Sequence, residues 1–88
     1  NFYTGRIEEV LLGDNPSVQV QVGAHRAEVR GLLLEEFIRR INPQAPNKLR
    51  KKDFQQVLEN LKTGGPILVA LHQRDNTGSL WQASIEQQ

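Results

Sequence analysis

The chain has 88 residues, 38% of them apolar and 24% charged, and a net charge of +1, a balance that excludes intrinsic disorder and suits one soluble domain with a single core. It contains no cysteine, so neither a disulfide framework nor a thiolate zinc site can hold the fold together. Its mainly apolar stretches, such as Ile67–Leu71, are far shorter than the roughly 20 residues of a membrane helix, and we expect no membrane partner.

The first third of the chain is predicted to form three strands. Phe2–Leu12 has the composition of a strand, and the turn-forming residues 13–17 end it. Valine alternates with glutamine over 18–22, which is the period of a strand with one buried face. Residues 23–24 offer a tight reversal before a third alternating stretch at 26–30, so we expect a hairpin here.

Past Gly31 the apolar period changes to that of a helix. The apolar residues of 34–41 fall on one stripe, and Glu35 and Glu36 come early, where the helix dipole favours acidic side chains. Asn42-Pro43 is expected to end this helix, because proline disfavours a helical residue before it.

The second half is predicted to contain one more helix and two strands. Apolar residues at helical spacing indicate a helix over 54–61, with Gly64 at its C-terminal cap. The stretches 67–71 and 80–85 have the character of strands, and the polar residues 74–79 form the turn between them.

This order of elements indicates an α+β domain that is mainly β. Five strands with two helices inserted between the third and the fourth fit a barrel of the oligonucleotide-binding (OB) type, and a layered α+β sheet has the same element count. The chain begins at Asn1 without a methionine and shows no signal peptide. We therefore expect residues 1–88 to be a single domain excised from a longer protein.

Short motifs of one known family occur in both halves of the chain. They are Gly5-Arg6-Ile7, Val10, Gly13-Asp14, Val18-Gln19-Val20, Glu28-Val29-Arg30, Gly65–Leu71 and Asp75–Leu80. Together they resemble staphylococcal-nuclease-like domains, and the resemblance covers most of the chain. It implies the five-stranded OB-type barrel rather than the layered sheet.

The resemblance also implies a chemistry. In that family a calcium ion held by carboxylates, a glutamate base and two arginines hydrolyse phosphodiesters, since cations stabilise charge on the phosphate oxygens and the base activates water. By position, Asp14 and Glu35 match the metal-binding carboxylates and Arg30 matches the first arginine. Calcium is expected only if this nuclease function holds, and no other cofactor is expected.

Two positions that this chemistry requires depart from the family pattern. Ile38 stands where the general base should be, and Ser79 stands where the second arginine should be. Glu36 points roughly 100° away from its neighbour on a helix, and Arg74 lies on the other side of the turn. Each missing group costs a factor of about 10² or more in rate. The resemblance thus implies a scaffold that has lost its catalytic activity.

Each remaining candidate also has an ordinary structural interpretation. Asp14 suits a turn that ends a strand, and Arg30 suits a solvated strand edge. Glu35 and Glu36 suit the first turn of a helix, where they complement the dipole. These interpretations stay open beside the catalytic ones.

Positive charge gathers in one segment, because no acidic residue occurs between Arg39 and Lys52. Such a segment can follow a nucleic-acid backbone or meet an acidic protein surface, although solvated helix ends carry similar charges. The candidate nucleic-acid-binding residues are Arg30, Arg39, Arg40, Lys48, Arg50, Lys51 and Lys52.

Few side chains are available for base stacking or for metal binding by histidine. Tyr3 and Trp81 are the candidates for stacking on strands, and Trp81 also suits packing at the core or at an edge. His25 and His72 lie far apart in the sequence with no ligand pattern around them, so we expect no histidine metal site.

Three functional hypotheses follow. The first is a non-catalytic binding module on a nuclease-like barrel, in contact with nucleic acid or a partner protein. The second is a divergent calcium-dependent phosphodiesterase that uses Asp14, Arg30 and Glu35, with Glu36 displaced into the role of the base. The third is a purely structural protein-interaction domain. The disrupted catalytic positions favour the first.

Overall fold

The computed structural model describes residues 1–87, which form five strands and two helices. In chain order these elements are β1 (Phe2–Leu11), β2 (Ser17–Val22), β3 (His25–Arg30), α1 (Gly31–Ile41), α2 (Lys51–Leu58), β4 (Pro66–Arg74) and β5 (Leu80–Gln87). The expected mixture of helices and strands, with strands predominating, is confirmed.

The five strands close into a barrel in the order β1-β2-β3-β5-β4. Neighbouring strands run antiparallel except β3 and β5, which pair in parallel through Arg26–Leu80, Ala27–Trp81 and Glu28–Gln82. The long β1 closes the barrel by pairing with β2 along one part and with β4 along another. A closed barrel leaves no unpaired sheet edge, and the layered sheet considered above is therefore wrong.

The barrel interior follows the period-2 pattern of its strands. Val18 and Val20 on β2 are fully buried, and they lie opposite Val29 and Ala27 on β3. The same alternation buries Ile67 and Val69 on β4 and Ala83 and Ile85 on β5. The alternating pattern at 18–22 therefore predicted the inward face correctly.

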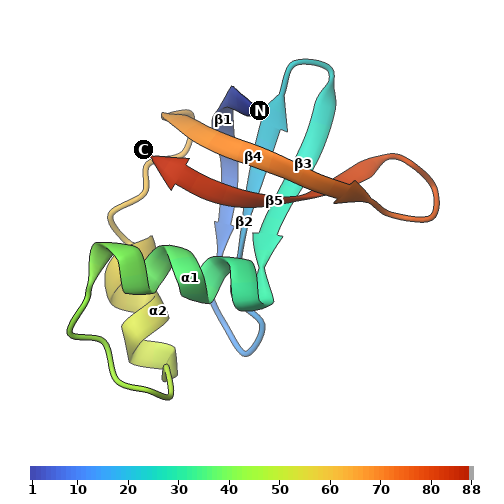
Figure 1. The fold of residues 1–88 in the computed structure, drawn as a ribbon. Coiled ribbons are helices and arrows are strands. Elements are labelled where there is room, and N and C mark those ends of the chain that lie inside the picture. Colours follow the sequence, from blue (N-terminus) through green and yellow to red (C-terminus); the bar gives the residue numbers. More distant parts are fainter. Residues whose placement is uncertain (88) are drawn as a thin grey trace.

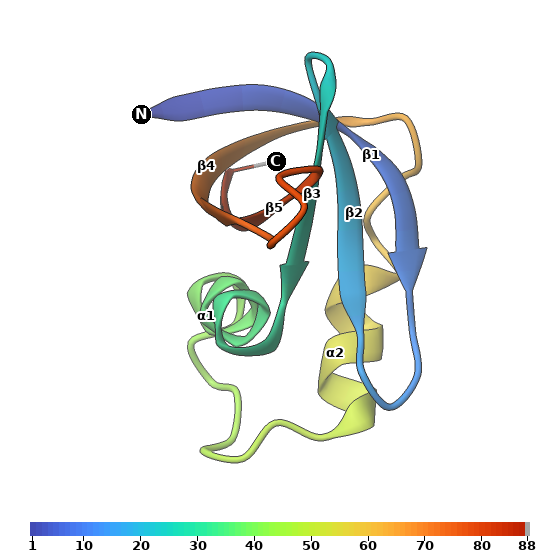
Figure 2. The same ribbon diagram turned by 90° about the vertical axis from the view of Figure 1, so that its right-hand side faces the viewer.

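Helix α1 covers one end of the barrel and packs against β3 and β5 (Figure 1). Its buried stripe consists of Leu34, Phe37 and Ile38, which join the core cluster of the barrel. Helix α2 lies beside α1 at the same end of the molecule, next to the β1–β2 turn, as the perpendicular view shows (Figure 2). The other end of the barrel, where β2 turns into β3, carries no helix.

Two details of the helices differ from the sequence-based expectation. Helix α1 begins at Gly31, so Glu35 and Glu36 lie beyond its first turn and not within it. Helix α2 ends at Leu58. Leu61 lies in the segment that follows the helix, and its side chain is buried there. Hydrophobic spacing alone extended the predicted helix through Leu61, because a buried side chain outside a helix produces the same pattern.

The cap assigned to Gly64 is also wrong. The Gly64 amide donates to the carbonyl oxygen of Ile7 over 2.6 Å, and the Ile7 amide donates to the carbonyl oxygen of Gly65 over 3.0 Å. This glycine pair therefore continues the β1–β4 pairing rather than ending a helix. In addition, β4 reaches Arg74, which was predicted to lie in the turn.

Candidate functional site

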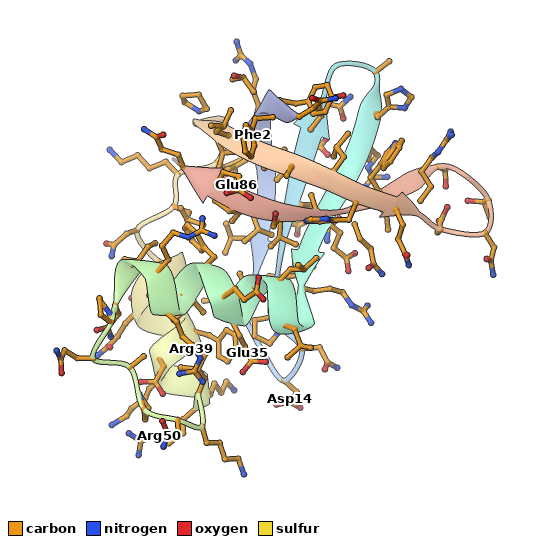
Figure 3. All side chains as sticks on the ribbon, viewed as in Figure 1. Phe2, Asp14, Glu35, Arg39, Arg50 and Glu86 are labelled. Atoms are coloured by element: carbon orange, nitrogen blue, oxygen red, sulfur yellow. The ribbon has the colours of Figure 1, made fainter. Side chains whose placement is uncertain are left out.

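A pocket between the β1–β2 turn and the start of α1 brings together the three residues that the family resemblance singled out. It has a volume of about 250 Å³, and Asp14, Arg30 and Glu35 line it together with Phe54 of α2. Figure 3 shows Asp14 in the turn and Glu35 on α1 at the same end of the molecule. The fold thus brings together residues that lie apart in the sequence.

Gly31 is responsible for part of this convergence. Its φ of 59° is in the left-handed region, which glycine adopts at little cost, and it turns the chain directly from β3 into α1. Arg30 therefore ends the strand at the point where the helix begins, and Glu35 follows one helical turn after Gly31. Arg30 lies 3.4 Å from the Glu28 carboxylate, so its charge is partly balanced on the strand.

The position at which the family resemblance would require a general base is closed to solvent. Ile38 is 0% exposed and belongs to the apolar face of α1. Glu36 is exposed, and it is not among the residues that line the pocket of Asp14 and Glu35. Among the described residues that line this pocket, only Asp14 and Glu35 carry a carboxylate that could take a proton from a water.

The position at which the family resemblance would require a second arginine is part of a tight turn. The Ser79 amide and the Thr77 hydroxyl both donate to Oδ1 of Asp75, over 3.0 and 2.9 Å. The hydrogen bond from Thr77, followed by those from backbone amides, lowers the pKa of Asp75 below its ordinary value. This loop is thus organised around its own carboxylate, and the guanidinium of Arg74 lies over the Trp81 ring, 4.9 Å from its centre.

The carboxylates of the pocket are a sparse set for calcium. Calcium takes roughly six to eight oxygen ligands in proteins, several of them from Asp or Glu. Among residues 1–87, no group of three or more His, Cys, Asp or Glu side chains is placed to hold one ion. Asp14 and Glu35 offer two carboxylates, and backbone carbonyls or water would have to supply the rest.

Two of the predicted phosphate-binding arginines are engaged in holding the helices in place. Arg39 donates from both terminal nitrogens to the carbonyl oxygens of Pro46 and Asn47, at 2.7 Å each, and so fixes the loop between α1 and α2. Figure 3 shows Arg39 on the side of α1 that faces this loop. Arg40 donates to the carbonyl oxygen of Ile85 over 2.7 Å. Nucleic-acid binding by these two side chains remains a prediction.

Within the described part of the chain, the other basic residues of this segment, Arg50 and the lysines, do not hold backbone carbonyls as Arg39 and Arg40 do. Arg50 lies 3.8 Å from the Asp53 carboxylate at the start of α2. Lys48, Lys51 and Lys52 are exposed, and within residues 1–87 they form no ion pair. Lys51 also borders a small pocket with Gly13 of the β1–β2 turn, so these lysines stand close to the end of the barrel that holds Asp14.

One feature that the sequence interpretation missed is the position of His25. It lies at the end of the barrel without helices, in a pocket that Tyr3 and Trp81 also line. The residues 25, 27 and 29 alternate along β3, so the period-2 pattern would have placed His25 on the inward face if the strand had been started one residue earlier. The two predicted stacking residues thus share one site.

A hydrogen-bonded chain of serine, histidine and glutamate also occurs, and it does not have the order of a catalytic triad. Nε2 of His72 lies 2.9 Å from the hydroxyl of Ser84, which donates to the Glu86 carboxylate over 3.0 Å. In a triad the histidine bridges the serine and the acid, whereas here Ser84 is the bridging residue and is itself buried. The hydrogen bond between His72 on β4 and Ser84 on β5 stabilises the pairing of these two strands.

Comparison with known proteins identifies no family model, no curated protein and no solved structure that matches this chain. The helices described in residues 1–87 are too short and too polar for any of them to cross a membrane.

Proposed function

We propose that this chain is a non-catalytic binding module on an OB-type, staphylococcal-nuclease-like barrel, and that it contacts nucleic acid at the end that carries α2. The observation that carries the proposal is the arrangement of Lys48, Lys51 and Lys52, which are exposed and free of ion pairs within the described residues. Phosphate groups are the ligands that such unpaired lysines attract, and their contacts release counterions.

The topology supports the proposed kind of barrel. The strand order β1-β2-β3-β5-β4, with β3 and β5 parallel, is what five strands of an OB-type barrel would require, and such barrels serve many oligonucleotide-binding proteins. The function is argued from the lysines and not from the fold, since one fold serves many functions.

The loss of catalysis is supported by the two replaced positions. The base would have to stand at Ile38, which is 0% exposed, and the second arginine at Ser79, which is tied to Asp75. Asp14, Arg30 and Glu35 then remain in one pocket, which shares Pro16 and Phe54 with the small pocket that Lys51 borders.

A titration with oligonucleotides at two salt concentrations tests this function. Fluorescently labelled single- and double-stranded DNA would be titrated at about 50 and 200 mM salt, and binding is expected to weaken steeply between them. The variant Lys51→Gln/Lys52→Gln should lower the slope of log K against log salt by about 1 to 2, because roughly 0.7 to 0.9 of a counterion is released per phosphate contact.

The matched control removes the same charge elsewhere. Arg6 and Lys62 are exposed and lie outside the basic segment, so Arg6→Gln/Lys62→Gln should leave the salt slope nearly unchanged. Equal effects of the two double variants would show that net charge alone drives binding. If the chain binds an acidic protein and does not bind DNA, its partner is a protein and not nucleic acid.

The shared pocket of Asp14, Arg30 and Glu35 favours one second candidate, a calcium-dependent phosphodiesterase. Incubation of DNA with the protein and calcium, with Asp14→Asn and Glu35→Gln as comparisons, tests it. Cleavage that disappears in both variants would establish this activity and would overturn the non-catalytic proposal. Cleavage that persists in both variants would exclude these carboxylates.

A further inference from the structure

The barrel is open at the end away from the helices, and the opening is lined by one inward-facing residue from each strand. Tyr3 pairs with the buried Val69, and Trp81 pairs with the buried Ala27, so both side chains belong to the inward face. They remain partly exposed because no element covers this end. The five inward residues at the opening are Tyr3, Val22, His25, Leu71 and Trp81.

These residues form the largest of the pockets described here, with a volume of about 620 Å³. Thr4 and the backbone of Gly23 add polar groups at its edge. Ligand sites in proteins have volumes of roughly 300 to 1,000 Å³, carry mainly apolar and aromatic linings with a few polar groups, and often lie in the mouths of β-barrels. The opening has the size and the lining of such a site.

The aromatic side chains of the opening suit a flat ligand. Trp81 and His25 meet edge to face, with ring centres 6.5 Å apart and planes at 74°. Tyr3 lines the same pocket and adds a third aromatic ring to its lining. Nε1 of Trp81 is buried and has no hydrogen-bond partner among the described residues.

The charges around the opening favour an anionic ligand over a cationic one. None of the described residues that line the pocket is acidic. The guanidinium of Arg74 lies over Trp81, 4.9 Å from the ring centre, and would repel a cation that approached the same ring. The nearest carboxylate along the chain, Asp75, already accepts hydrogen bonds from Thr77 and Ser79. A phosphate beside Arg74 would be attracted by an uncompensated charge.

We propose that the open end of the barrel is a nucleotide-binding site, in which a nucleobase stacks between Tyr3 and Trp81 and its phosphate is held by Arg74. The ligand is a nucleotide unit, either free or as part of a single strand. Duplex DNA is excluded, because its bases are stacked on each other and cannot enter the pocket.

This inference goes beyond the proposed function, because the pocket and the lysines of α2 lie at opposite ends of the barrel (Figure 1). Each can therefore fail without the other. A nucleotide in the opening does not require the lysines, and a DNA backbone along the lysines does not require the opening.

The chain offers a direct probe, since Trp81 is its only tryptophan. Titration with adenosine 5′-monophosphate (AMP) is expected to quench the fluorescence of Trp81 with a saturable dependence. Tyr3→Ala should weaken AMP binding about 10-fold, because stacking of a base on one aromatic side chain contributes roughly that factor or more. Tyr3→Phe keeps the ring and should bind nearly as the unaltered chain does.

Phe2→Ala is the matched control for Tyr3→Ala. Phe2 precedes Tyr3 on β1, is 62% exposed and does not line the pocket, so its removal should leave the affinity for AMP unchanged. A loss of affinity in Phe2→Ala equal to that in Tyr3→Ala would overturn the proposal.

Adenosine and ribose 5-phosphate separate the two parts of the ligand. Adenosine should quench Trp81 with a lower affinity than AMP, and Arg74→Gln should reduce the affinity for AMP to that for adenosine. Quenching by ribose 5-phosphate as strong as that by AMP would show that the base is not recognised, and absence of saturable quenching by both AMP and a short oligodeoxyadenylate would also overturn the proposal.

The oligodeoxyadenylate also distinguishes the source of the nucleotide. If it quenches Trp81 at lower concentration than AMP does, the site takes a nucleotide within a strand, and if AMP is the tighter ligand, the site takes a free nucleotide. Both outcomes support the site. Lys51→Gln/Lys52→Gln should leave AMP binding unchanged, which keeps a failure of the proposed function distinct from a failure of this inference.

Discussion

Arg40 on α1 donates from Nη1 to the carbonyl oxygen of Ile85 on β5 over 2.7 Å, and so ties the helix that closes the barrel to the last strand. The same nitrogen lies 3.2 Å from the carbonyl oxygen of Glu86 and 3.6 Å from its carboxylate. A guanidinium engaged in this way stabilises the fold, whereas the sequence alone suggested that it binds phosphate.

Arg40→Gln is expected to lower the free energy of unfolding by about 1 to 2 kcal/mol, because a charged donor to buried or half-buried carbonyls contributes more than a neutral one, and partial exposure reduces this contribution. Urea unfolding followed by Trp81 fluorescence measures the change. Lys52→Gln, an exposed charge without a partner, should change stability by less than about 0.5 kcal/mol. A variant with unaltered stability but weaker DNA binding would return Arg40 to the nucleic-acid interface.

Ile38→Glu places a carboxylate where the related chemistry would need its base. Because Ile38 is 0% exposed, the new charge would be buried without a partner, and we expect a loss of more than about 4 kcal/mol and an unfolded or molten chain. Circular dichroism and thermal unfolding test this, with Ile38→Val as the control at a cost of about 0.5 to 1.5 kcal/mol. A folded Ile38→Glu variant that cleaved DNA with calcium would contradict the structural role given to Ile38.

Gly5 lies where β1 approaches β2 too closely for a side chain. A Cβ atom at Gly5 would be 2.6 Å from Cγ1 of Val20 and 2.8 Å from the carbonyl oxygen of Gln21. Gly5→Ala should therefore destabilise the barrel by about 1 to 3 kcal/mol through overpacking. The neighbouring Arg6→Ala, on the outer face, should cost less than about 0.5 kcal/mol, and equal losses in urea unfolding would disprove the packing argument.

Asp75 should make the β4–β5 turn sensitive to acid. The hydrogen bond from Thr77 lowers the pKa of Asp75 in the folded state below the ordinary value of 3.8, so the unfolded chain takes up the proton first. The contribution of the Asp75 carboxylate to stability is therefore fully present at pH values above its ordinary pKa. It is lost as the pH falls through the lowered pKa of the folded state. Asp75→Asn should lack this part of the acid dependence.

The comparison of thermal midpoints at pH 6 and at successively lower pH measures the effect. The difference between the unaltered chain and Asp75→Asn is expected to shrink as the pH falls below about 4. A difference that stays constant over this range would show that the carboxylate charge does not hold the turn.

Local patterns in the sequence predicted several elements well. The alternation of valine and glutamine over 18–22 and the apolar stripe of 34–41 depend only on which side chains face the core, and the structure has β2 and α1 there. The end of α2 was predicted less well, because Leu61 is buried by the chain that follows the helix and extends the helical pattern without belonging to the helix.

The candidate sites could be predicted only in part. The family resemblance named Asp14, Arg30 and Glu35, and the fold places all three around one pocket. It did not predict that Arg39 and Arg40 would donate hydrogen bonds to backbone carbonyl oxygens. Every residue has such an acceptor, so the amino-acid sequence does not show which one an arginine will contact. Glu86 was not predicted as a partner of Arg40, because residues 40 and 86 come together only through the packing of α1 against β5.

The amino-acid sequence determined the periods, the turns and the absence of cysteine, because these follow from neighbouring side chains and from composition. Only the tertiary structure decided how the sheet closes, since β1 pairs with β4 and β3 pairs with β5 through backbone groups that all residues share. That closure brings Tyr3, from the start of the chain, to the same opening as Trp81, near its end. No local pattern contains this proximity, because it arises from strand pairing over a long separation in sequence.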